Sequence, residues 1–220
     1  MFIENYLDVL TLLILLSSFI LTASKRTSSY IRVFRAQSLL IAVAAAITGF
    51  YSFNESGHVD ILIICTIIIV LKVIIIPNML YKTYSNIGTK VEKDFFWNIP
   101  MLLIICCVIV VITYFSISDI DGLQSGSANI QAVNSISLVL TGMFFMISRK
   151  KAIGQIVGFL TLENGLFLTA MVFTHGMPFI VDMGIFVDLI TGVLIMGMMV
   201  FRINEKFESI DVSKLKNLRG

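Results

Sequence analysis

Seven apolar runs of about twenty residues each divide this chain, and they constrain its fold more than any other feature. About 20 residues of α-helix, rising about 1.5 Å per residue, span the hydrocarbon core of a bilayer. The chain has 220 residues, so the runs leave no segment for a soluble domain. They predict seven transmembrane helices, at Tyr6–Ala23, Ala36–Phe53, Asp60–Tyr81, Asn98–Ser118, Ile130–Ser148, Ala152–Thr174 and Phe179–Phe201.

The composition also indicates an integral membrane protein. Hydrophobic residues make up 57% of the chain and charged residues only 14%, whereas soluble domains carry about 25% charged residues. The first residues have no positive charge before their apolar run and no small-residue cleavage site after it, so we expect a retained helix and not a signal peptide. The sequence predicts an all-α, multi-pass protein of the cell (inner) membrane.

Basic residues gather in alternate connections between the predicted helices. The clusters follow the first, third, fifth and seventh runs, and the other connections are mostly acidic. Since Lys and Arg are retained on the cytoplasmic side, the N-terminus is predicted outside and the C-terminus inside. The net charge is only +2, and the basic residues are spread over loops, so anionic lipid headgroups are the expected neighbours and nucleic acid is not.

The same charge pattern suggests an internal repeat. Helix, basic loop, helix, acidic loop, helix describes residues 6–81 and again residues 130–201, at an offset of 125 residues that places Gln37 opposite Glu163 within one residue. Parallel repeats occur in transport proteins, but the positive-inside rule alone produces this pattern, so duplication stays open. We expect four membrane helices in residues 1–118, an outer loop at 119–129, a three-helix bundle at 130–205 and a cytoplasmic tail at 206–220.

Two carboxylic acids, Glu163 and Asp188, lie at the middle of the last two runs. The short connection between these runs makes them a hairpin, which puts both acids roughly 18–20 Å from the turn. A charge at the midplane costs roughly 2.5–3.5 kcal/mol on insertion scales, and two buried carboxyl groups close together favour the protonated form of one of them. We predict that both acids take part in proton transfer. A structural hydrogen bond is the alternative for each.

Lys72 is a third charge near the midplane, too far from either end of its run for the ammonium group to reach water along its stem. Pro77 leaves the carbonyl group of Val73 without its helical donor, so we expect a kink and a polar gap beside the lysine. Lys72 is therefore predicted either to belong to the proton path or to form a buried salt bridge with an acid.

Amide side chains inside the runs are secondary candidates for holding water along such a path, although interhelical hydrogen bonds explain them as well. They are Gln37, Asn134, Gln155 and Asn164. The three cysteines lie inside apolar runs without the spacing of a cluster or zinc site. The two histidines fall at helix ends, where they cannot face each other as haem ligands. We expect no metal or cofactor in this chain.

Several segments resemble known membrane subunits. Arg149-Lys150-Lys151, the stretch Gly158–Ala170 and the run Val187–Gly192 resemble, in order and orientation, the K-type membrane subunit of complex I. With the runs Arg35–Leu40 and Lys72–Asn78, the whole chain resembles hydrogenase-4 component E, a membrane subunit of formate hydrogenlyase-type energy-converting hydrogenases.

The resemblance implies roles for five of these residues. Glu163 and Asp188 would be acids of a proton path, and Arg149, Lys150 and Lys151 would be cytoplasmic loop charges that support coupling. Asp188 stands where the complex I subunit has glutamate, and the connection between the two acid helices is shorter here. Because of these differences, the reach of the second acid and the water content of the path need not match those of the complex I subunit.

The resemblance also implies a function and partners. The chain would be a non-catalytic subunit that transfers protons, coupled to redox chemistry in partner subunits. The partners would be antiporter-like membrane subunits and hydrogenase subunits that hold the nickel–iron site and iron–sulfur clusters. Two alternatives remain, namely a stand-alone carrier of an ion or small solute and a purely structural scaffold of the complex.

Overall fold

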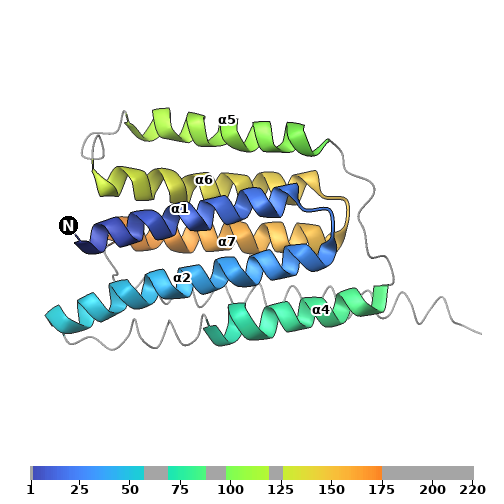
Figure 1. Ribbon diagram of the computed structural model, residues 1–220, viewed down its shortest axis with the longest axis horizontal. Helices are drawn as coiled ribbons and strands as arrows, with labels where there is room; N and C mark the ends of the chain where they lie inside the picture. The colour runs from blue at the N-terminus through green and yellow to red at the C-terminus, as the bar shows by residue number, and fades with distance from the viewer. Residues whose placement is uncertain (1, 57–68, 88–97, 119–125, 175–220) are drawn as a thin grey trace, which may run out of the picture.

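The computed structural model describes residues 2–56, 69–87, 98–118 and 126–174, and almost all of these residues are helical. The helices lie side by side and alternate in direction along the chain (Figure 1). The predicted last helix, which contains Asp188, lies outside the described residues, as does the predicted cytoplasmic tail. The elements are α1 (Phe2–Ala23), α2 (Thr27–Ser56), the π-helix η1 (Ile69–Ile75), α4 (Ile76–Ile87), α5 (Ile99–Ser118), α6 (Ser127–Ser148) and α7 (Ala152–Thr174).

The distribution of side chains is that of a membrane protein. Five of the described helices are long and apolar enough to cross a bilayer, namely α1, α2, α5, α6 and α7. Large apolar side chains such as Ile104 and Phe115 are 63% and 65% exposed, while Ser135 and Asn164 are 0% exposed. Apolar residues thus face outward and polar residues meet inside, as lipid surroundings require. The all-α membrane class predicted from the sequence is confirmed.

Several helices extend beyond their approximate predicted ends. The second helix begins at Thr27 instead of Ala36, so Arg32 and Arg35 lie on α2 and not in a loop. The third extends past Tyr81 to Ile87, and α6 begins at Ser127, inside the expected outer loop. Hydropathy marks only the part of a helix that lies in hydrocarbon, whereas the backbone hydrogen-bond ladder continues through polar residues beyond it.

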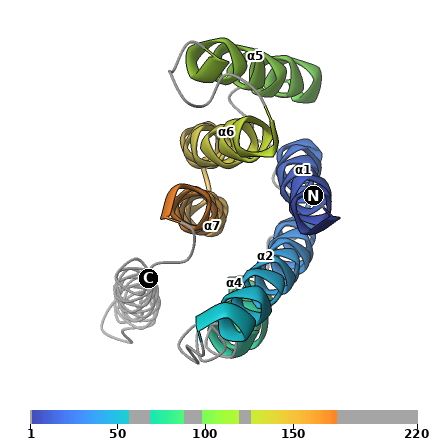
Figure 2. The ribbon, with the colours of Figure 1, turned by 90° about the vertical axis from the view of Figure 1, so that its left-hand side faces the viewer.

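Four helices form the centre of the bundle, and the others flank it. Helix α1 packs on α2 and α6, while α7 packs on α6 and α2. Figure 2 shows α5 outside α6, and α4 beside α2 on the opposite side of the bundle. The four central helices therefore enclose a shared interior, to which η1 adds a face through its contact with α2.

The two central hairpins repeat each other. Helices α1 and α6 each have 22 residues, three residues separate α1 from α2 and α6 from α7, and the second hairpin begins 125 residues after the first. Three side-chain hydrogen bonds join α1 to α6, each between residues 123 apart, so these helices are parallel. The positive-inside rule does not demand that the first helices and the connections agree in length. The second helices differ, since α2 has 30 residues and α7 has 23, so duplication stays a prediction.

Glycines set the close contact between α6 and α7. A Cβ atom at Gly142 would lie 2.5 Å from the backbone nitrogen of Leu162, and one at Gly165 would lie 2.6 Å from that of Val139. Gly158 makes an equally close approach to Met146. Small residues let membrane helices approach this closely. The contact fixes the depth of Glu163, which follows Leu162 directly.

Candidate functional site

The middle of the bundle holds a buried ion pair. Nζ of Lys72 lies 3.1 Å from Oε1 of Glu163, and each side chain is 4% exposed. Glu163 stands at the centre of α7, with eleven residues on either side. Lys72 points into the bundle, as its distance from the helix ends led us to expect, and forms the salt bridge considered as one of its two alternatives. Opposite charges without water attract strongly and offset part of their cost of burial.

Lys72 is presented by an irregular helix. The π-helix η1 contains Lys72 at its centre and gives way to α4 at Ile76, one residue before Pro77. Proline has no N–H, so Pro77 cannot donate to the carbonyl group of Val73 in an α pattern or to that of Lys72 in a π pattern. The irregularity expected beside the lysine is present, in the form of a wider turn. Such segments are frequent at functional sites.

Amide side chains connect the ion pair to the first hairpin. Nζ of Lys72 donates to Oδ1 of Asn164 at 3.3 Å, and Nδ2 of Asn164 donates to Oε1 of Gln37 at 3.2 Å. Nε2 of Gln37 then donates to Oγ of Ser17 at 2.9 Å and to the carbonyl oxygen of Ile14 at 3.3 Å. The network thus joins η1, α7, α2 and α1. It fixes the position of Lys72 and leaves the lysine and the acid as the groups that can exchange a proton.

The other predicted positions lie apart from this network. Asn134 donates to Oγ1 of Thr11 at 3.1 Å, in the contact between α6 and α1. Gln155 is exposed and donates to the carbonyl oxygen of Arg149 at 3.1 Å, so it holds the connection between α6 and α7. Asp188 lies outside the described residues, and its pairing with Glu163 stays a prediction.

Arg149 lies in the connection between α6 and α7, where the sequence placed a loop charge, but its side chain is buried. Its side chain is 1% exposed, donates through Nη2 to the carbonyl oxygen of Thr22 at 2.8 Å and donates through Nη1 to the hydroxyl of Tyr30 at 3.0 Å. Lys150 is exposed and Lys151 is half-buried. The carbonyl group at the end of α1 has no partner within its own helix, so it attracts the guanidinium group into the bundle.

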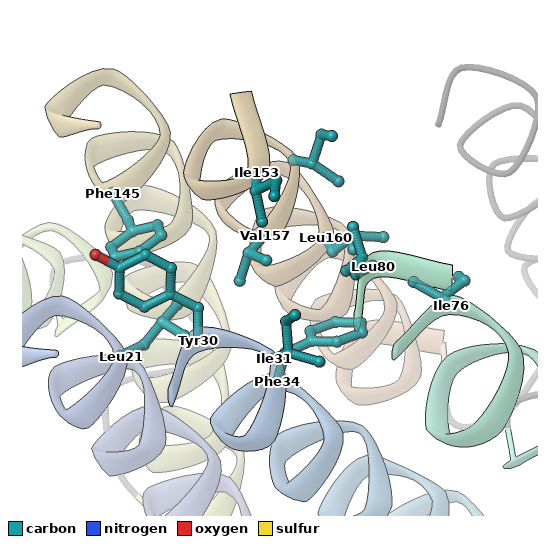
Figure 3. Packing of buried hydrophobic residues seen from close by; sticks show 11 residues of the cluster. Leu21, Tyr30, Ile31, Phe34, Ile76, Leu80, Phe145, Ile153, Val157 and Leu160 are labelled. Carbon is teal, nitrogen blue, oxygen red and sulfur yellow. The ribbon is translucent and has the colours of Figure 1, made fainter. Parts of the chain in front are cut away.

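Aromatic rings complete the surroundings of Arg149. Its guanidinium carbon lies 4.3 Å from the centre of the Phe145 ring and 4.9 Å from that of Tyr30. The two rings meet edge to face, and Figure 3 shows them together at one side of a buried apolar cluster that includes Leu21. Arginine stacks well on aromatic faces because its planar group is weakly hydrated. Arg149 therefore joins the two hairpins at the end of the bundle that carries their connections.

Sequence reasoning missed two features of this site. It treated Asn164 and Gln37 as separate candidates, although the repeat offset places Gln37 opposite Glu163. It also grouped Arg149 with Lys150 and Lys151 as cytoplasmic loop charges, because the charge pattern does not distinguish one basic loop residue from another. Tyr30 and Phe145, each close to a predicted connection, were the signal that could have identified an arginine site.

Within the described ranges, no group of three or more His, Cys, Asp or Glu side chains is placed to hold a metal ion. Of the two cysteines there, Cys106 is buried and Cys107 is exposed. Oγ1 of Thr22 accepts a weak hydrogen bond from Sγ of Cys106 at 3.9 Å. The expectation that redox groups belong to partner subunits stays a prediction.

Fold and site together define a helical membrane protein in which a lysine of η1 and a glutamate of α7 form a buried ion pair. Its homologues include hydrogenase-4 component E, a distant relationship that confirms the resemblance seen in the sequence. The proteins of that name from Escherichia coli and Shigella flexneri are 22% identical over 149 residues, which cover 68% of this chain and 69% of theirs.

An uncharacterized protein of Mycobacterium tuberculosis is 26% identical over 153 residues, which cover 69% of this chain and 70% of that protein. No family model and no solved structure matches the chain.

Proposed function

We propose that this chain is a proton-transferring membrane subunit of a hydrogenase-4-like complex. The homology to hydrogenase-4 component E supports membership in a hydrogenase complex, and the ion pair of Lys72 and Glu163 supports the role in proton transfer. We place the subunit in the cell (inner) membrane with seven spans, N-terminus outside, beside antiporter-like and hydrogenase subunits. The nickel–iron site and the iron–sulfur clusters are assigned to those partners.

The ion pair carries the proposal because its geometry permits proton exchange. A proton that arrives on the Glu163 carboxylate neutralises it and removes the attraction that holds the Lys72 ammonium group. The lysine then gives up a proton more readily, because a lone cation in a low-dielectric interior is unfavourable. The two groups are 3.1 Å apart and largely shielded from water, so protonation of one directly controls the other.

The helices that carry Glu163 and Lys72 differ in regularity, which suggests different roles for the two residues. Glu163 sits on a regular helix whose close contact with α6 limits its movement. Lys72 sits on a π-helix, which can exchange its wider turn for an α turn and rotate the lysine. We therefore infer that Lys72 is the moving member of the pair. A change of packing near η1, driven by the redox reaction in a partner subunit, would switch the pair between exchange with one side and with the other.

The substitution Glu163→Gln tests the proposal in the assembled complex. It keeps the shape of the side chain and removes its titratable group, so we expect loss of at least about nine-tenths of the proton transfer coupled to hydrogenase activity. Inverted membrane vesicles and a dye that reports the proton gradient give this measurement, and hydrogenase turnover with an uncoupler serves as the reference. Leu166→Ala, at an exposed position on the same helix, is the control.

Two results would contradict the proposal. Full coupled transfer in Glu163→Gln, with normal complex assembly, would indicate a structural scaffold. Proton or solute transport by the purified chain alone in liposomes would indicate an independent carrier.

A further inference from the structure

A line of polar side chains follows the contact between α1 and α6. Asp8 accepts from Gln131 at 2.7 Å, and one turn further Thr11 accepts from Asn134 at 3.1 Å. After another two turns the hydroxyls of Ser18 and Thr141 lie 3.4 Å apart. The parallel direction of the two helices keeps these pairs in register, and we call the set, together with Ser17 and Ser137, the α1–α6 seam.

The two ends of the seam differ in how deeply their side chains are buried. Asp8 and Gln131 are half-buried at the end of the bundle that carries the N-terminus, whereas Asn134 and Thr141 are buried. At the other end Arg149 is 1% exposed and fills the space against Thr22, one turn beyond Ser18. Arginine keeps its positive charge at every physiological pH. The seam is thus accessible at one end and closed by a fixed cation at the other.

The seam also meets the network of the buried ion pair. Gln37 donates to Ser17 and to the carbonyl oxygen of Ile14, which lies one turn beyond Thr11 on α1. Ile14 is the sixth residue after Asp8, which places it about 9 Å further along the helix axis. Asn164 and Lys72 follow directly from Gln37. A path from the half-buried end to the ion pair therefore needs to cross only part of the membrane.

A hydroxyl group in the seam indicates where water belongs. Oγ of Ser137 is 0% exposed and has no hydrogen-bond partner among the residues that the structure describes. Ser137 lies one turn after Asn134 and one turn before Thr141, on the same face of α6. Oγ of Ser38, beside Gln37 on α2, is also buried without a hydrogen-bond partner among the described residues. Buried hydroxyls of this kind are normally satisfied by ordered water.

We propose that the α1–α6 seam is a water-filled half-channel that leads protons between the Asp8 end of the bundle and the Lys72–Glu163 pair, with Arg149 as its closed end. The inference rests on the proposed function for the identity of the ion. Hydration of the seam is independent of that function. A fixed positive charge at the closed end repels protons and other cations, so exchange is limited to the side that the charge pattern places outside.

Thiol accessibility tests this inference in the full chain within native membranes. In a background with Cys65, Cys106 and Cys107 replaced by Ala, one new cysteine is introduced by Ser137→Cys or by Leu138→Cys, at neighbouring positions that are both 0% exposed. The probe is the silver ion, a small thiol-reactive cation, followed by denaturation and maleimide labelling of the thiols that remain. Thr141→Cys gives a second reading if Ser137→Cys impairs assembly.

We expect silver added on the Asp8 side to block the cysteine of Ser137→Cys about tenfold faster than that of Leu138→Cys, because thiol reaction requires access to water. Asn134→Leu should slow the reaction, and silver added on the other side should react slowly. Asn5→Cys, exposed near the N-terminus, identifies the side. Equal rates at positions 137 and 138, or access only from the Arg149 end, would overturn the half-channel.

The result separates the half-channel from the proposed function. Glu163→Gln should leave the silver reaction unchanged, because the experiment detects water and not proton transfer. Rapid reaction at Ser137→Cys together with full coupling in Glu163→Gln would retain the hydrated seam and refute its role in proton transfer through the pair.

Discussion

At the level of single residues, the buried charges of this protein are of two kinds, those that can change protonation state and one that cannot. Lys72 and Glu163 form a pair whose members can both change protonation state, and each is held by contacts from another part of the chain. Arg149 cannot lose its charge, and it is enclosed by a carbonyl group, a hydroxyl and two rings. The first arrangement suits exchange of a proton, and the second suits attachment of one hairpin to the other.

Removal of one charge of the pair should lower the stability of the folded chain more than removal of both. Lys72→Met should lower the stability of the folded chain by about 3–5 kcal/mol, because Glu163 loses its cationic partner in a buried site. The double substitution Lys72→Met with Glu163→Leu should recover most of that stability and should remain defective in coupled proton transfer. Thermal unfolding in mild detergent measures the first effect and vesicle assays measure the second.

Lys82→Ala is the control for this prediction, since Lys82 is exposed on α4. Lys72→Ala should impair coupling more than Lys82→Ala. Equal defects in the two variants would mean that the buried position of Lys72 is irrelevant to transfer.

Arg149→Lys should not be a conservative change. Lysine keeps the charge but lacks the planar fork that reaches Thr22 and Tyr30 together, and it stacks poorly on Phe145. We expect less assembled protein in membranes and a lower unfolding temperature, with Arg149→Ala worse than Arg149→Lys. Lys150→Ala, at the exposed neighbouring position, should behave like the wild type. A normal unfolding temperature for Arg149→Ala would show that the contacts contribute nothing to stability.

At the scale of elements, the two helices that carry the ion pair have opposite mechanical properties. Helix α7 is locked to α6 by three glycine contacts at successive levels, which leave no space for a side chain. The π-helix η1 has fewer constraints of this kind, because its wider turn and the following Pro77 interrupt the regular ladder. This contrast supports the proposal that Lys72 is the moving member of the pair.

Substitution of these glycines should displace Glu163. Gly142→Ala places a methyl group against the backbone of Leu162, directly before Glu163, so the helices must separate by several tenths of an ångström or more. We expect coupled proton transfer to fall severalfold and thermal stability to decrease, with a similar effect for Gly165→Ala. The larger substitution Ala36→Val, at an exposed position on α2, should be tolerated. Full activity in both glycine variants would exclude close packing as the support of Glu163.

At the scale of the whole molecule, the repeated hairpins explain where the polar residues meet. Helix α1 lies against α6, and α2 lies against α7, so equivalent helices are neighbours about the centre of the bundle. Their hydrogen bonds join residues 123 or 127 apart, on either side of the repeat offset. The hydrogen bond from Asn164 of α7 to Gln37 of α2 crosses the contact between the hairpins directly beside the buried pair.

The direction of the molecule in the membrane can be tested by labelling. Cysteines introduced by Ser127→Cys and near Ser56 should react with an impermeant maleimide from outside the cell, because the basic clusters place that end of the bundle outside. Cysteines at Ser28 and Ser213 should react only after the cytoplasmic face is opened. Labelling in intact cells and in inverted vesicles distinguishes the two cases. The reverse pattern would overturn the orientation and the direction of the proposed half-channel.

The all-α membrane class, the approximate positions of the described helices and the burial of Lys72 and Glu163 could be predicted from the sequence. These properties follow from local quantities, since an apolar run of about 20 residues must be helical in lipid and a charge at its middle cannot reach water. The repeat offset even placed Gln37 at the correct depth beside Glu163.

The contacts between these polar groups depend on how the helices pack. Neither the hydrogen bonds from Lys72 through Asn164 and Gln37 nor the enclosure of Arg149 could be read from the sequence, because partners 92 to 127 residues apart depend on which helix faces which. Hydropathy records the depth of a residue along its helix and carries little information about rotation around the axis. Rotation and packing, not depth, bring the lysine to the glutamate and the arginine between its two rings.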